Sequence, residues 1–374
     1  MGESRVTNQS VAMDTFVMTD RGARQVHDLL GKASTLMVDG KPFSTSGRGF
    51  FRSARSTLLR VETEEGFSVR LTGNHLILKV ASSARSTVRA EWIETKNIKP
   101  GDRLLLHNHR YLGNWQGDFG EAEGYVAGLL LGEGPIKEDT SVISIRMPSC
   151  RERLAHSTAE EADPRGKPQP GSLVEAPHPD EMGVSFGRVK EMALRLSVLP
   201  QEKQITAALE KCSSDFYRAF LRGLFDCDGS AQGTQKKGIS IRLSRRDVSF
   251  LEALQRMLLR LGIVGRISQE RKNEEEIPAA QGEEESPSPA RRRHELLITN
   301  NNVQYFDHLV GFANAHKQAH LTKLLTSYKR VLNRERFTAT AKKITPEPDD
   351  DVCSVRVPGV NAFDANGFYV HSAG

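Results

Sequence analysis

The sequence predicts a mixed fold that combines an all-β unit with an α+β unit built from two similar halves. Two observations carry this prediction. Residues 10–110 alternate apolar and polar side chains between short turns, and glycine-bearing apolar segments recur at Gly124–Gly134 and Phe220–Ser230. A chain of 374 residues can bury a sizeable core and is long enough for two domains.

The composition allows a polyanionic partner and argues against a cysteine-based framework. The net charge is +5 and the isoelectric point is about 9.0, a modest basicity that solvated surface charge could also explain. The four cysteines form no Cys-x-x-Cys pair, which disfavours a zinc site and suits a reducing compartment. No apolar run reaches the ~18 residues of a membrane span, and the amino-terminal MGESRVTNQ is unlike a signal peptide. We therefore expect no membrane partner and a cytoplasmic location.

The amino-terminal part of the chain is predicted to be all-β. Thr15–Thr19 alternates like a strand, Asp20–Gly22 is a turn signal, and Val26–Leu30 fits a short helical turn. Phe51–Val80 continues as a run of alternating strands. Trp92–Leu106 then contains a helical turn, a Pro-Gly pair and a strand.

The two glycine-bearing segments are predicted to be helices in close contact. A glycine inside a helix costs about 0.5–1 kcal/mol relative to alanine, so its presence at matching places indicates a packing reason. If Ala127, Gly128 and Gly223 face each other, the backbones can approach more closely than the usual roughly 8–10 Å. The carboxylates of Glu133 and Asp228 would then lie together at the negative ends of two helix dipoles, where Mg²⁺ could be held with several waters. For either segment alone, a core helix with an exposed acidic end is an equally good interpretation.

Strands and a further helix follow each of these segments. Ser141–Met147 and Gln235–Arg245 are strand-like, and the second is basic. Pro148–Gly187 is rich in Pro, Ser, Gly and charge, which predicts a solvated insertion, and Ser268–Arg293 is expected to be a flexible charged loop between two strands. Helices are expected at Arg188–Leu199, Arg246–Leu261 and Tyr305–Lys329, and a strand at His294–Asn300. The repeated order of helix, strands and helix predicts a saddle with pseudo-two-fold symmetry.

The segments VAGLLLGEG and LRGLFDCDG resemble the paired nine-residue motifs of the LAGLIDADG homing endonucleases. The acidic residue in the eighth position of that motif binds metal in the family, which implies Glu133 and Asp228 as metal ligands and Mg²⁺ as the cofactor. Two metals between these carboxylates could activate water and stabilise the leaving oxygen. The resemblance also implies an αββαββα repeat, a monomer, and cleavage of a long, asymmetric site in double-stranded DNA. The first motif departs from the family pattern, because Leu131 replaces an acidic residue and Glu133 replaces aspartate.

Further residues are expected to contribute to cleavage and to DNA binding. Lys203 resembles the lysine that intein endonucleases carry before Ile-Pro, although Thr206 replaces the proline, and Lys317 resembles its counterpart in the second half. Such a lysine can polarise water or neutralise developing negative charge. Alternate residues of the basic strands would point into the major groove. The candidates for this contact are Arg146, Lys236, Lys237, Arg242 and Arg245. Each of these basic residues could equally be an ordinary exposed cation.

The beginning of the chain resembles the splicing domain of inteins, which is a horseshoe of β-strands of the Hint type. When residues are counted from Ser10, Asp14 and Thr15 stand at the fifth and sixth positions, where that family has Asp-Thr. The segment TGNHLIL matches the family's Thr-x-x-His motif through Thr72 and His75. For His75 alone, an ordinary hydrogen-bonded histidine of a β-sheet is the alternative interpretation.

The carboxyl end matches the same family except at the reacting positions. Asn366-Gly367 marks a hairpin turn between two alternating runs, and His371 matches the penultimate histidine of inteins. Ser372 stands where the family has asparagine, and Ala373 stands where the downstream nucleophile is expected.

These resemblances imply that one domain is inserted into another. The splicing domain would comprise residues 10–110 and 335–372, and the endonuclease would comprise residues 115–333. Residues 1–9 and 373–374 would be remnants of the host protein (the extein) or of a tag. The flanks TNQ and Ala-Gly faintly resemble those around a cysteine of ribonucleotide reductase, which makes that enzyme the candidate host.

The chain is predicted not to splice as written. Splicing begins with an acyl shift onto residue one, which the Thr-x-x-His pair would support by hydrogen bonding and proton transfer. The hydroxyl of Ser10 is a weaker nucleophile than a thiol, Ala373 offers no nucleophile, and Ser372 has no side-chain amide to cyclise. Ser354, which stands where the family often has aspartate, is a further weakness. Deliberate inactivation and natural decay are both open explanations.

Two other functions fit the sequence. The endonuclease domain could bind DNA without cleaving it, because Glu133 is one methylene longer than aspartate and a metal misplaced by about 1 Å can cost ~100-fold in rate. Alternatively, the chain could be a DNA-binding regulator whose β unit resembles a self-processing domain but does not splice.

Overall fold

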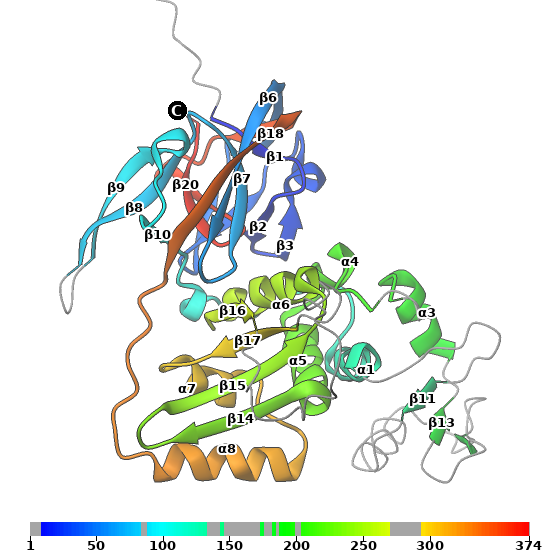
Figure 1. Cartoon of the computed structure of the whole chain (residues 1–374). Coiled ribbons are helices and arrows are strands. Elements are labelled where there is room, and N and C mark those ends of the chain that lie inside the picture. The colour runs from blue at the N-terminus through cyan, green and yellow to red at the C-terminus, as the bar shows by residue number, and fades with distance from the viewer. Residues whose placement is uncertain are drawn as a thin grey trace, which may run out of the picture.

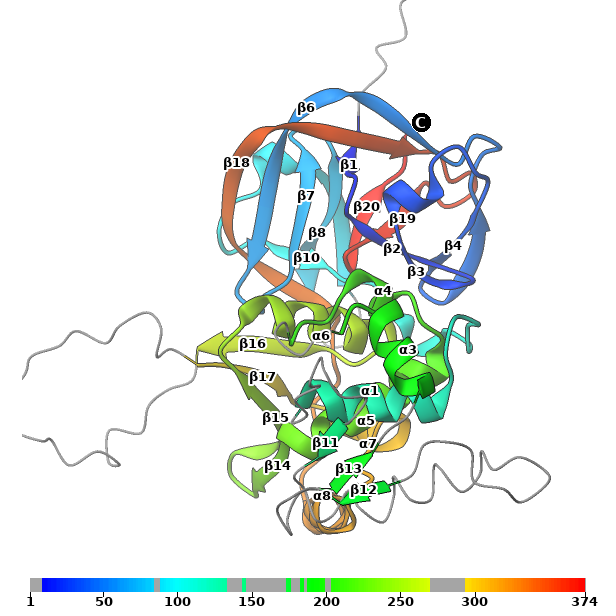
Figure 2. The ribbon, with the colours of Figure 1, turned by 90° about the vertical axis from the view of Figure 1, so that its right-hand side faces the viewer.

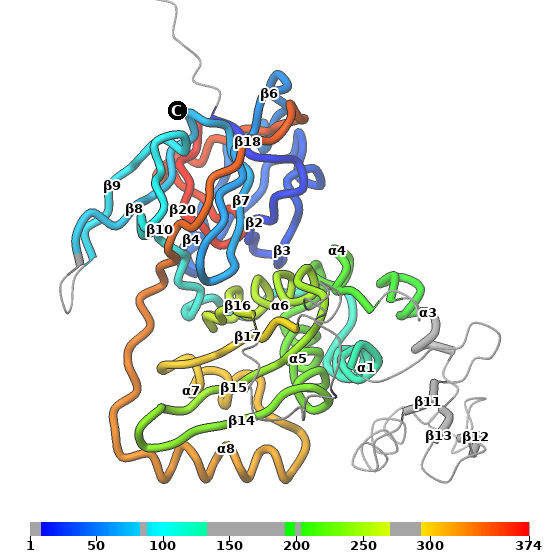
Figure 3. The backbone as a smooth tube through the Cα atoms, viewed as in Figure 1, coloured from blue at the N-terminus to red at the C-terminus, as the bar shows by residue number. Residues whose placement is uncertain are grey.

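The computed structural model describes two packed units, one all-β and one α+β (Figure 1). The described residues are 9–83, 88–132, 143–145, 173–175, 182–184, 187–198, 203–269 and 293–373. Figure 3 follows the chain from the β unit into the α+β unit and back, so that both ends of the described chain lie in the β unit. Within the described part of the chain, no helix combines the length and the apolar character that crossing a membrane would require.

The β unit is built around one large antiparallel sheet. Its strand order is β1-β7-β6-β18-β10-β8-β20-β19, with β9 beside β8, and a smaller sheet has the order β3-β2-β4-β5. The elements are β1 (Val11–Ala12), β2 (Phe16–Thr19), β3 (Gly22–Gln25), η1 (Val26–Leu29), β4 (Thr35–Val38), β5 (Lys41–Ser44), β6 (Phe50–Thr63), β7 (Ser68–Thr72), β8 (Leu76–Ser83), β9 (Val88–Glu94), η2 (Thr95–Asn97), β10 (Arg103–Leu105), η3 (His109–Tyr111), β18 (Thr338–Val355), β19 (Ala362–Ala365) and β20 (Phe368–His371).

Strands from the two ends of the sequence alternate in the large sheet. β18 lies between β6 and β10, and β20 lies between β8 and β19. The long strands β6 and β18 pair antiparallel from Thr63 opposite Ala341 to Phe50 opposite Val355, and they arch together over the unit (Figure 2). Two of the carboxyl-terminal strands, β18 and β20, therefore lie in the interior of the sheet, and the all-β unit contains strands from both ends of the chain.

The predicted hairpin turn at Asn366-Gly367 is confirmed. Both residues have positive φ, 51° at Asn366 and 95° at Gly367, which is the conformation that a type I′ turn requires. β19 and β20 pair directly on either side of the turn, with Ala365 opposite Phe368. This register places His371 at the end of β20, opposite Ala362.

The α+β unit contains two central helices, α1 and α5, flanked by sheets. Its elements are α1 (Glu121–Gly132), β11 (Ile143–Ile145), β12 (Leu173–Glu175), β13 (Met182–Val184), α3 (Gly187–Arg195), α4 (Ala207–Glu210), α5 (Ser214–Asp228), β14 (Gly229–Thr234), β15 (Gly238–Arg245), α6 (Val248–Arg260), β16 (Gly265–Gln269), β17 (His294–Ile298), α7 (Asn302–Leu309) and α8 (Ala315–Ser327). The sheet of the second half has the order β14-β15-β17-β16, and β11-β13-β12 form a separate small sheet. Figure 2 shows the four-stranded sheet to one side of α5, with α6 above it.

One face of the four-stranded sheet is buried against helices. Alternate residues of β15 and β17 point into this core, as strand geometry requires. They pack with the apolar faces of α5, α6 and α7, and the core includes Leu224, Ile239, Ile241, Leu243, Leu254, Leu296, Ile298, Val303 and Phe306. The other face of the sheet is therefore left for polar side chains.

The predicted helices begin at side-chain caps. Ser213 accepts a hydrogen bond from the backbone N–H of Phe216 at the start of α5, and Asp247 accepts one from Ser249 at the start of α6. The amphipathic helix expected after the basic strand is confirmed as α6, and the strand expected at 294–300 is confirmed as β17.

The single helix expected over Tyr305–Lys329 is wrong. The structure has two helices there, α7 and α8, because Gly311 adopts a left-handed conformation with φ of 62° just after α7. Asn314 then accepts hydrogen bonds from the backbone N–H groups of His316 and Lys317 and begins α8. Apolar residues keep a helical spacing across the break between α7 and α8, so the sequence pattern does not reveal the break.

The segment Pro148–Gly187 is not wholly a solvated insertion. β12 and β13 lie within it and pair with each other, and β13 also pairs with β11. Strand pairing supplies backbone hydrogen bonds that the polar composition of the segment does not reveal. The flexible loop expected at Ser268–Arg293 falls largely outside the described residues.

The two units share a hydrogen-bonded interface. The backbone carbonyl of Glu65, in the β6–β7 turn, accepts from the N–H of Ile267 at 2.9 Å and from Nε2 of Gln255 at 2.7 Å. On the other side of the interface, Nε of Arg110 donates to the carbonyl of Gly262 at 3.0 Å. These hydrogen bonds fix the β6–β7 turn and η3 of the β unit against helix and strand residues of the α+β unit.

A buried ion-pair network lies beside this interface. Glu210 is 1% exposed and contacts Arg256 and Arg260, each at 2.7 Å. The Arg260 guanidinium also lies 4.9 Å from the centre of the Phe16 ring in β2. Burial alone would raise the pKa of Glu210, but the two arginines more than offset burial and lower the pKa of this carboxyl. The buried carboxylate of Glu210 therefore stays ionised because Arg256 and Arg260 compensate for its burial.

We predict that Glu210→Ala lowers the free energy of unfolding of the α+β unit by about 3–5 kcal/mol, because it leaves two arginines without their buried partner. Urea unfolding followed by the fluorescence of Trp115, which lies in the same core, measures the change. Because folding lowers the pKa of Glu210, its contribution is complete above the ordinary glutamate pKa of about 4.3. It is lost as the pH falls through the folded-state pKa, so the difference between the two proteins should shrink in acid. Glu64→Ala, at an exposed position, is the control; equal effects of the two changes would contradict the prediction.

Candidate functional sites

The central helices α1 and α5 are in backbone contact at their glycines. A Cβ atom added to Gly128 would lie 2.8 Å from the backbone nitrogen of Leu224 and 3.1 Å from the carbonyl carbon of Gly223. A Cβ atom added to Gly223 would lie 3.2 Å from the backbone nitrogen of Leu129. The expected face-to-face packing of Gly128 and Gly223 is therefore confirmed, and no larger residue fits without separating the helices.

This packing brings the carboxyl ends of the two helices together. Asp228 is the last residue of α5, and a Cβ atom on Gly132, the last residue of α1, would lie 3.7 Å from its Oδ2 atom. Glu133 and Arg146 lie outside the described residues, so the place of Glu133 beside this carboxylate and the contact of Arg146 with DNA are still predictions from the sequence.

Asp228 is partly buried among cations. Its side chain is 25% exposed, and Oδ2 forms an ion pair with Nη2 of Arg245. The same Nη2 donates to the carbonyl of Leu131 at 2.9 Å. Burial raises the pKa of Asp228, while Arg245, Lys203 and Lys317 oppose that rise. The carboxylate at the helix ends is thus surrounded by positive charge.

The two lysines expected to serve the motif helices lie at matching places. Nζ of Lys317 donates to four carbonyls at the end of α5, namely Phe225 (3.3 Å), Asp226 (2.7 Å), Cys227 (3.3 Å) and Gly229 (2.7 Å). Nζ of Lys203 lies 3.5 Å from the carbonyl of Gly132 at the end of α1. Each lysine therefore neutralises the negative end of one helix dipole. Lys203 and Lys317 are brought to the site that contains Asp228.

The polar face of the second-half sheet carries part of the expected DNA-binding set. Arg242 of β15 lies on this face and pairs with Glu295 at 2.9 Å. Its cross-strand neighbour in β17, Leu297, lies opposite Arg266 of β16, so the two arginines share one row of the sheet. Sequence reasoning missed Arg266, although its alternation with the buried Ile267 could have placed it there.

Three other predicted DNA contacts do not lie on this row. β15 begins at Gly238, so Lys236 and Lys237 are exposed in the turn before it and not on the strand. Arg245 is three residues from Arg242 and points to the opposite face, toward the helix ends. The expected basic strand is therefore wrong in two respects. Lys236 and Lys237 precede the strand, and Arg245 points to the face opposite Arg242.

The donor atoms near Asp228 suit a hard cation. The described part of the chain contains no group of three or more His, Cys, Asp or Glu side chains placed to hold a metal. Mg²⁺ needs fewer protein ligands than that, because it retains waters and is commonly held by one or two carboxylates together with substrate phosphates. Asp228, with the carbonyl oxygens at the helix ends, fits this requirement.

A second constellation surrounds Ser10 in the β unit. The backbone N–H of Ser10 donates to Oγ1 of Thr72 at 3.1 Å, and Nδ1 of His75 lies 3.1 Å from the carbonyl oxygen of Ser10. Burial lowers the pKa of His75 to about 4, so this imidazole is neutral at physiological pH. The Thr-x-x-His residues and residue one are therefore brought together, as the sequence predicted.

Ser354 and Ser53 complete this constellation; the sequence marked Ser354 only as a weak replacement for aspartate and did not single out Ser53. Oγ of Ser354 donates to the carbonyl oxygen of Gln9 at 3.0 Å. It also lies 2.8 Å from Oγ of Ser10 and 2.9 Å from Oγ of Ser53. Because its one proton is given to Gln9, the other two hydroxyls donate to it. Ser354 thus connects the nucleophile to the carbonyl that it would attack and is not merely a weak replacement for aspartate.

The carboxyl-terminal residues lie beside the same peptide bond. Nδ1 of His371 is 3.1 Å from Oε1 of Gln9, and the Trp92 ring contacts the His371 ring edge-on at 5.1 Å between centroids. Burial lowers the pKa of His371. Ser372 is buried and its hydroxyl accepts from the N–H of Val357 at 3.3 Å. The two ends of the chain therefore meet at one centre.

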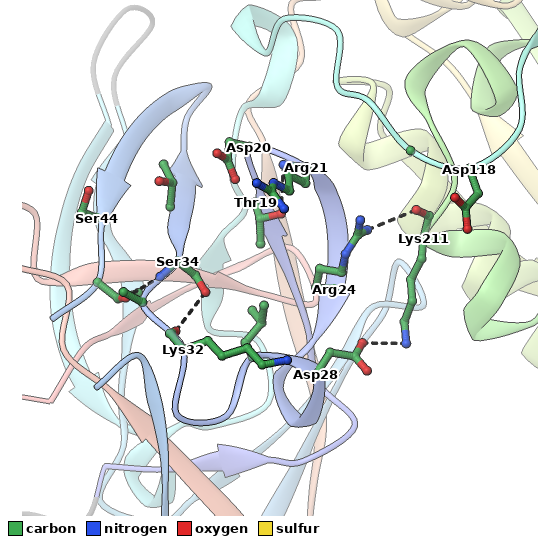
Figure 4. A pocket seen from close by; sticks show the side chains of 15 residues that line it. Thr19, Asp20, Arg21, Arg24, Asp28, Lys32, Ser34, Ser44, Asp118 and Lys211 are labelled. Carbon is green, nitrogen blue, oxygen red and sulfur yellow. Dashed lines mark hydrogen bonds and ion pairs between the residues drawn. The ribbon is translucent and has the colours of Figure 1, made fainter. Parts of the chain in front are cut away.

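A cavity at the joint between the units belongs to neither centre (Figure 4). It has a volume of about 780 Å³ and is lined by residues of both units. Arg24 donates to the carbonyl of Lys211 at 3.1 Å, and Nζ of Lys211 pairs with Asp28 at 2.6 Å. Both interactions join a residue of the β unit to Lys211 of the α+β unit, so they hold the two units together.

Comparison with known families identifies the α+β unit. Residues 215–311 match the model of the LAGLIDADG-like domain. They include α5, α6, α7 and the four-stranded sheet. Residues 215–311 therefore form a LAGLIDADG-like domain. The chain combines this α+β unit with a β unit in which residues from both ends of the chain meet around Ser10.

Three curated relatives align with most of this chain at low identity. The replication factor C small subunit of Methanocaldococcus jannaschii is 23% identical over 292 residues, which cover 77% of this chain and 14% of the relative. The A subunit of DNA gyrase from Mycobacterium gordonae is 24% identical over 313 residues, covering 82% and 52%. The alpha subunit of the ribonucleoside-diphosphate reductase NrdEB from Bacillus subtilis is 19% identical over 313 residues, covering 74% and 28%. The chain thus spans at most 52% of the length of these relatives.

Two solved structures resemble parts of the chain weakly. Variants of the homing endonuclease I-DmoI have a TM-score of 0.31 and 16% identity, covering 51% of this chain and 95% of that chain. The Ssp DnaB mini-intein variant M86 has a TM-score of 0.22 and 15% identity, covering 26% and 61%.

We predict that Gly128→Ala destabilises the α+β unit even though alanine favours a helix. The gain in helix propensity is about 0.5–1 kcal/mol, whereas overpacking against the backbone of α5 costs about 1–3 kcal/mol. Because the added Cβ atom would also overlap the carbonyl oxygen of Phe220, the cost falls at the upper end of this range, and the net loss should be about 2 kcal/mol, measured by urea unfolding. Gly113→Ala is the matched control, because a Cβ atom there meets nothing within 4 Å. A Gly128→Ala protein as stable as the control would show that the helices are not in backbone contact.

Proposed function

We propose that the chain is an intein whose LAGLIDADG domain cleaves both strands of a long, asymmetric DNA site with the help of Mg²⁺. The observation that carries this proposal is the position of Asp228, at the joined ends of two tightly packed helices whose ends are each held by a lysine. Asp228 and Glu133, the residue after α1, would hold the metal. A bound metal supplies an activated water and neutralises the leaving oxygen of the phosphodiester.

The protein residues have separate roles in this proposal. Lys203 and Lys317 keep the helix ends in place and add positive charge beside the scissile phosphate. Arg242 and Arg266 face the bases and phosphates from the sheet. Arg146, Lys236 and Lys237 are proposed as further contacts to the DNA. Both halves belong to one polypeptide, so a monomer can reach both strands.

We further propose the organisation predicted from the sequence. Residues 10–110 and 335–372 form the splicing domain, residues 115–333 form the endonuclease, and residues 1–9 and 373–374 belong to a host protein or a tag. A ribonucleotide reductase is one candidate host, supported by the flanks and by one relative of that name beside two with other names. A cytoplasmic location fits a DNA substrate and a reducing compartment.

The splicing domain is proposed to be arrested in this chain. Ser10 would attack the carbonyl of Gln9, whose oxygen accepts a hydrogen bond from Ser354. In that acyl shift the Oγ–C bond forms, the C–N bond breaks, and the hydroxyl proton ends on the released amine. Ala373 cannot accept the acyl group, and Ser372 cannot cyclise, so the later steps have no reacting groups.

We predict that the protein cuts a plasmid library at one long site in the presence of Mg²⁺ and that Asp228→Asn reduces cutting by at least ~100-fold. Asp215→Asn, at the opposite end of α5 where the side chain is 60% exposed, should cut normally. Cleavage by the Asp228→Asn protein would exclude the proposed centre. If neither protein cuts but both bind DNA in a salt-sensitive manner, the domain is a DNA-binding relic.

We also predict that the chain stays intact after long incubation with a thiol and that splicing activity returns when the reacting groups are restored together. The restored protein carries Ser10→Cys, Ser372→Asn and Ala373→Cys. Mass spectrometry of the products distinguishes ligation, cleavage and intact chain. A ligated product from the unaltered chain would contradict the proposed arrest. No splicing by the restored protein would favour a non-splicing DNA-binding regulator.

A further inference from the structure

Arg245 links the two motif helices at the proposed metal centre. It is the last residue of β15, and its Nη2 atom contacts both the carbonyl of Leu131 in α1 and Oδ2 of Asp228 in α5. Its side chain is only 19% exposed. A cation of the protein therefore stands at the place where the negative ends of two helices and a carboxylate meet.

Arg245 differs from the two lysines in what it contacts. The hydrogen bonds described above for Lys203 and Lys317 go to backbone carbonyls, whereas Arg245 pairs with the carboxylate itself. A divalent metal on Asp228 would need the negative charge that Arg245 already neutralises, and it would be repelled by the nearby guanidinium. The guanidinium and the metal therefore compete for one carboxylate.

Arg245 is also incompletely satisfied where it stands. Its Nε atom is buried and has no hydrogen-bond partner among the residues that the structure describes. The guanidinium lies 4.9 Å from the centre of the Phe250 ring, which supports it without fixing it to one acceptor. A DNA phosphate is a better partner, because it matches the planar fork of arginine and can accept two hydrogen bonds at once.

We propose that Arg245 occupies Asp228 in the DNA-free protein and transfers to a phosphate of bound DNA, so that divalent metal loads onto Asp228 only together with DNA. This inference rests on the proposed function, since it needs Asp228 as a metal ligand. It assigns Arg245 a positioning role that controls the order of assembly. A protein that loads metal in this order holds a weak metal site until its substrate arrives.

The alternative is that Arg245 is a fixed structural link between α1 and α5. In that case it stays on Asp228 when DNA binds, and removing it loosens the helix ends without improving the metal site. The two roles predict opposite changes in metal affinity, so a binding measurement separates them without any measurement of cleavage.

The test is the affinity of the complete chain for Mn²⁺ without DNA, measured by isothermal titration calorimetry. We expect Arg245→Met to bind Mn²⁺ roughly tenfold or more tightly than the unaltered protein, because a competing charge is removed. Arg242→Met is the matched control; it removes a cation from the same strand but from the opposite face, where Glu295 is its partner. Asp228→Asn combined with Arg245→Met should abolish the gain.

A second measurement needs no change at Arg245 and so covers the case in which Arg245→Met fails to fold. The unaltered protein should bind Mn²⁺ roughly tenfold more tightly with duplex DNA that carries its site than without DNA. Equal affinities with and without DNA, or no gain in a folded Arg245→Met protein, overturn the proposal. If Asp228→Asn leaves Mn²⁺ binding to the DNA complex unchanged, the metal centre itself is wrong and the proposed function fails with it.

Discussion

The backbone contact between α1 and α5 is the constraint on which the α+β unit depends. Gly128 and Gly223 let the two helices approach until each lies against the backbone of the other, a distance that side chains would prevent. Only at this distance do the ends of both helices meet beside Asp228. Each glycine therefore destabilises its helix by about 0.5–1 kcal/mol relative to alanine. The close approach that it allows brings the two helix ends into a single centre shared by both halves.

The same contact creates an electrostatic problem that basic side chains solve. Two helix dipoles end together with a partly buried carboxylate, so negative charge accumulates at one place. Lys203, Lys317 and Arg245 compensate for it from three different elements. The compensation differs in kind: the lysines neutralise backbone carbonyls, and the arginine neutralises the carboxylate. Under the proposed function, the carboxylate becomes available to a metal when a DNA phosphate takes over the arginine.

The sequence predicted what local patterns encode and missed what depends on distant partners. The motif glycines, the hairpin at Asn366-Gly367 and the meeting of His75 with Ser10 follow from short motifs with fixed spacing. The role of Ser354 could not be predicted, because its partner Ser10 is 344 positions away and only strand pairing brings them together. The direction of Arg245 could have been predicted, because an odd spacing from Arg242 places the two side chains on opposite faces of the strand. Treating both arginines as one set of basic residues hid this difference.

The insertion itself has a simple structural explanation. The chain leaves the β unit after β10 and returns at β18, and these two strands are neighbours in the sheet, with Leu105 opposite Thr338. The N–H of Leu106 donates to the carbonyl of Phe337 at 2.8 Å, so the points of exit and return are one hydrogen bond apart. Inserting a domain whose ends meet there costs only the entropy of closing a loop between two neighbouring strands. This cost grows slowly with the length of the loop. The β unit can therefore carry the whole α+β unit without altering the strands that hold Ser10 and His371.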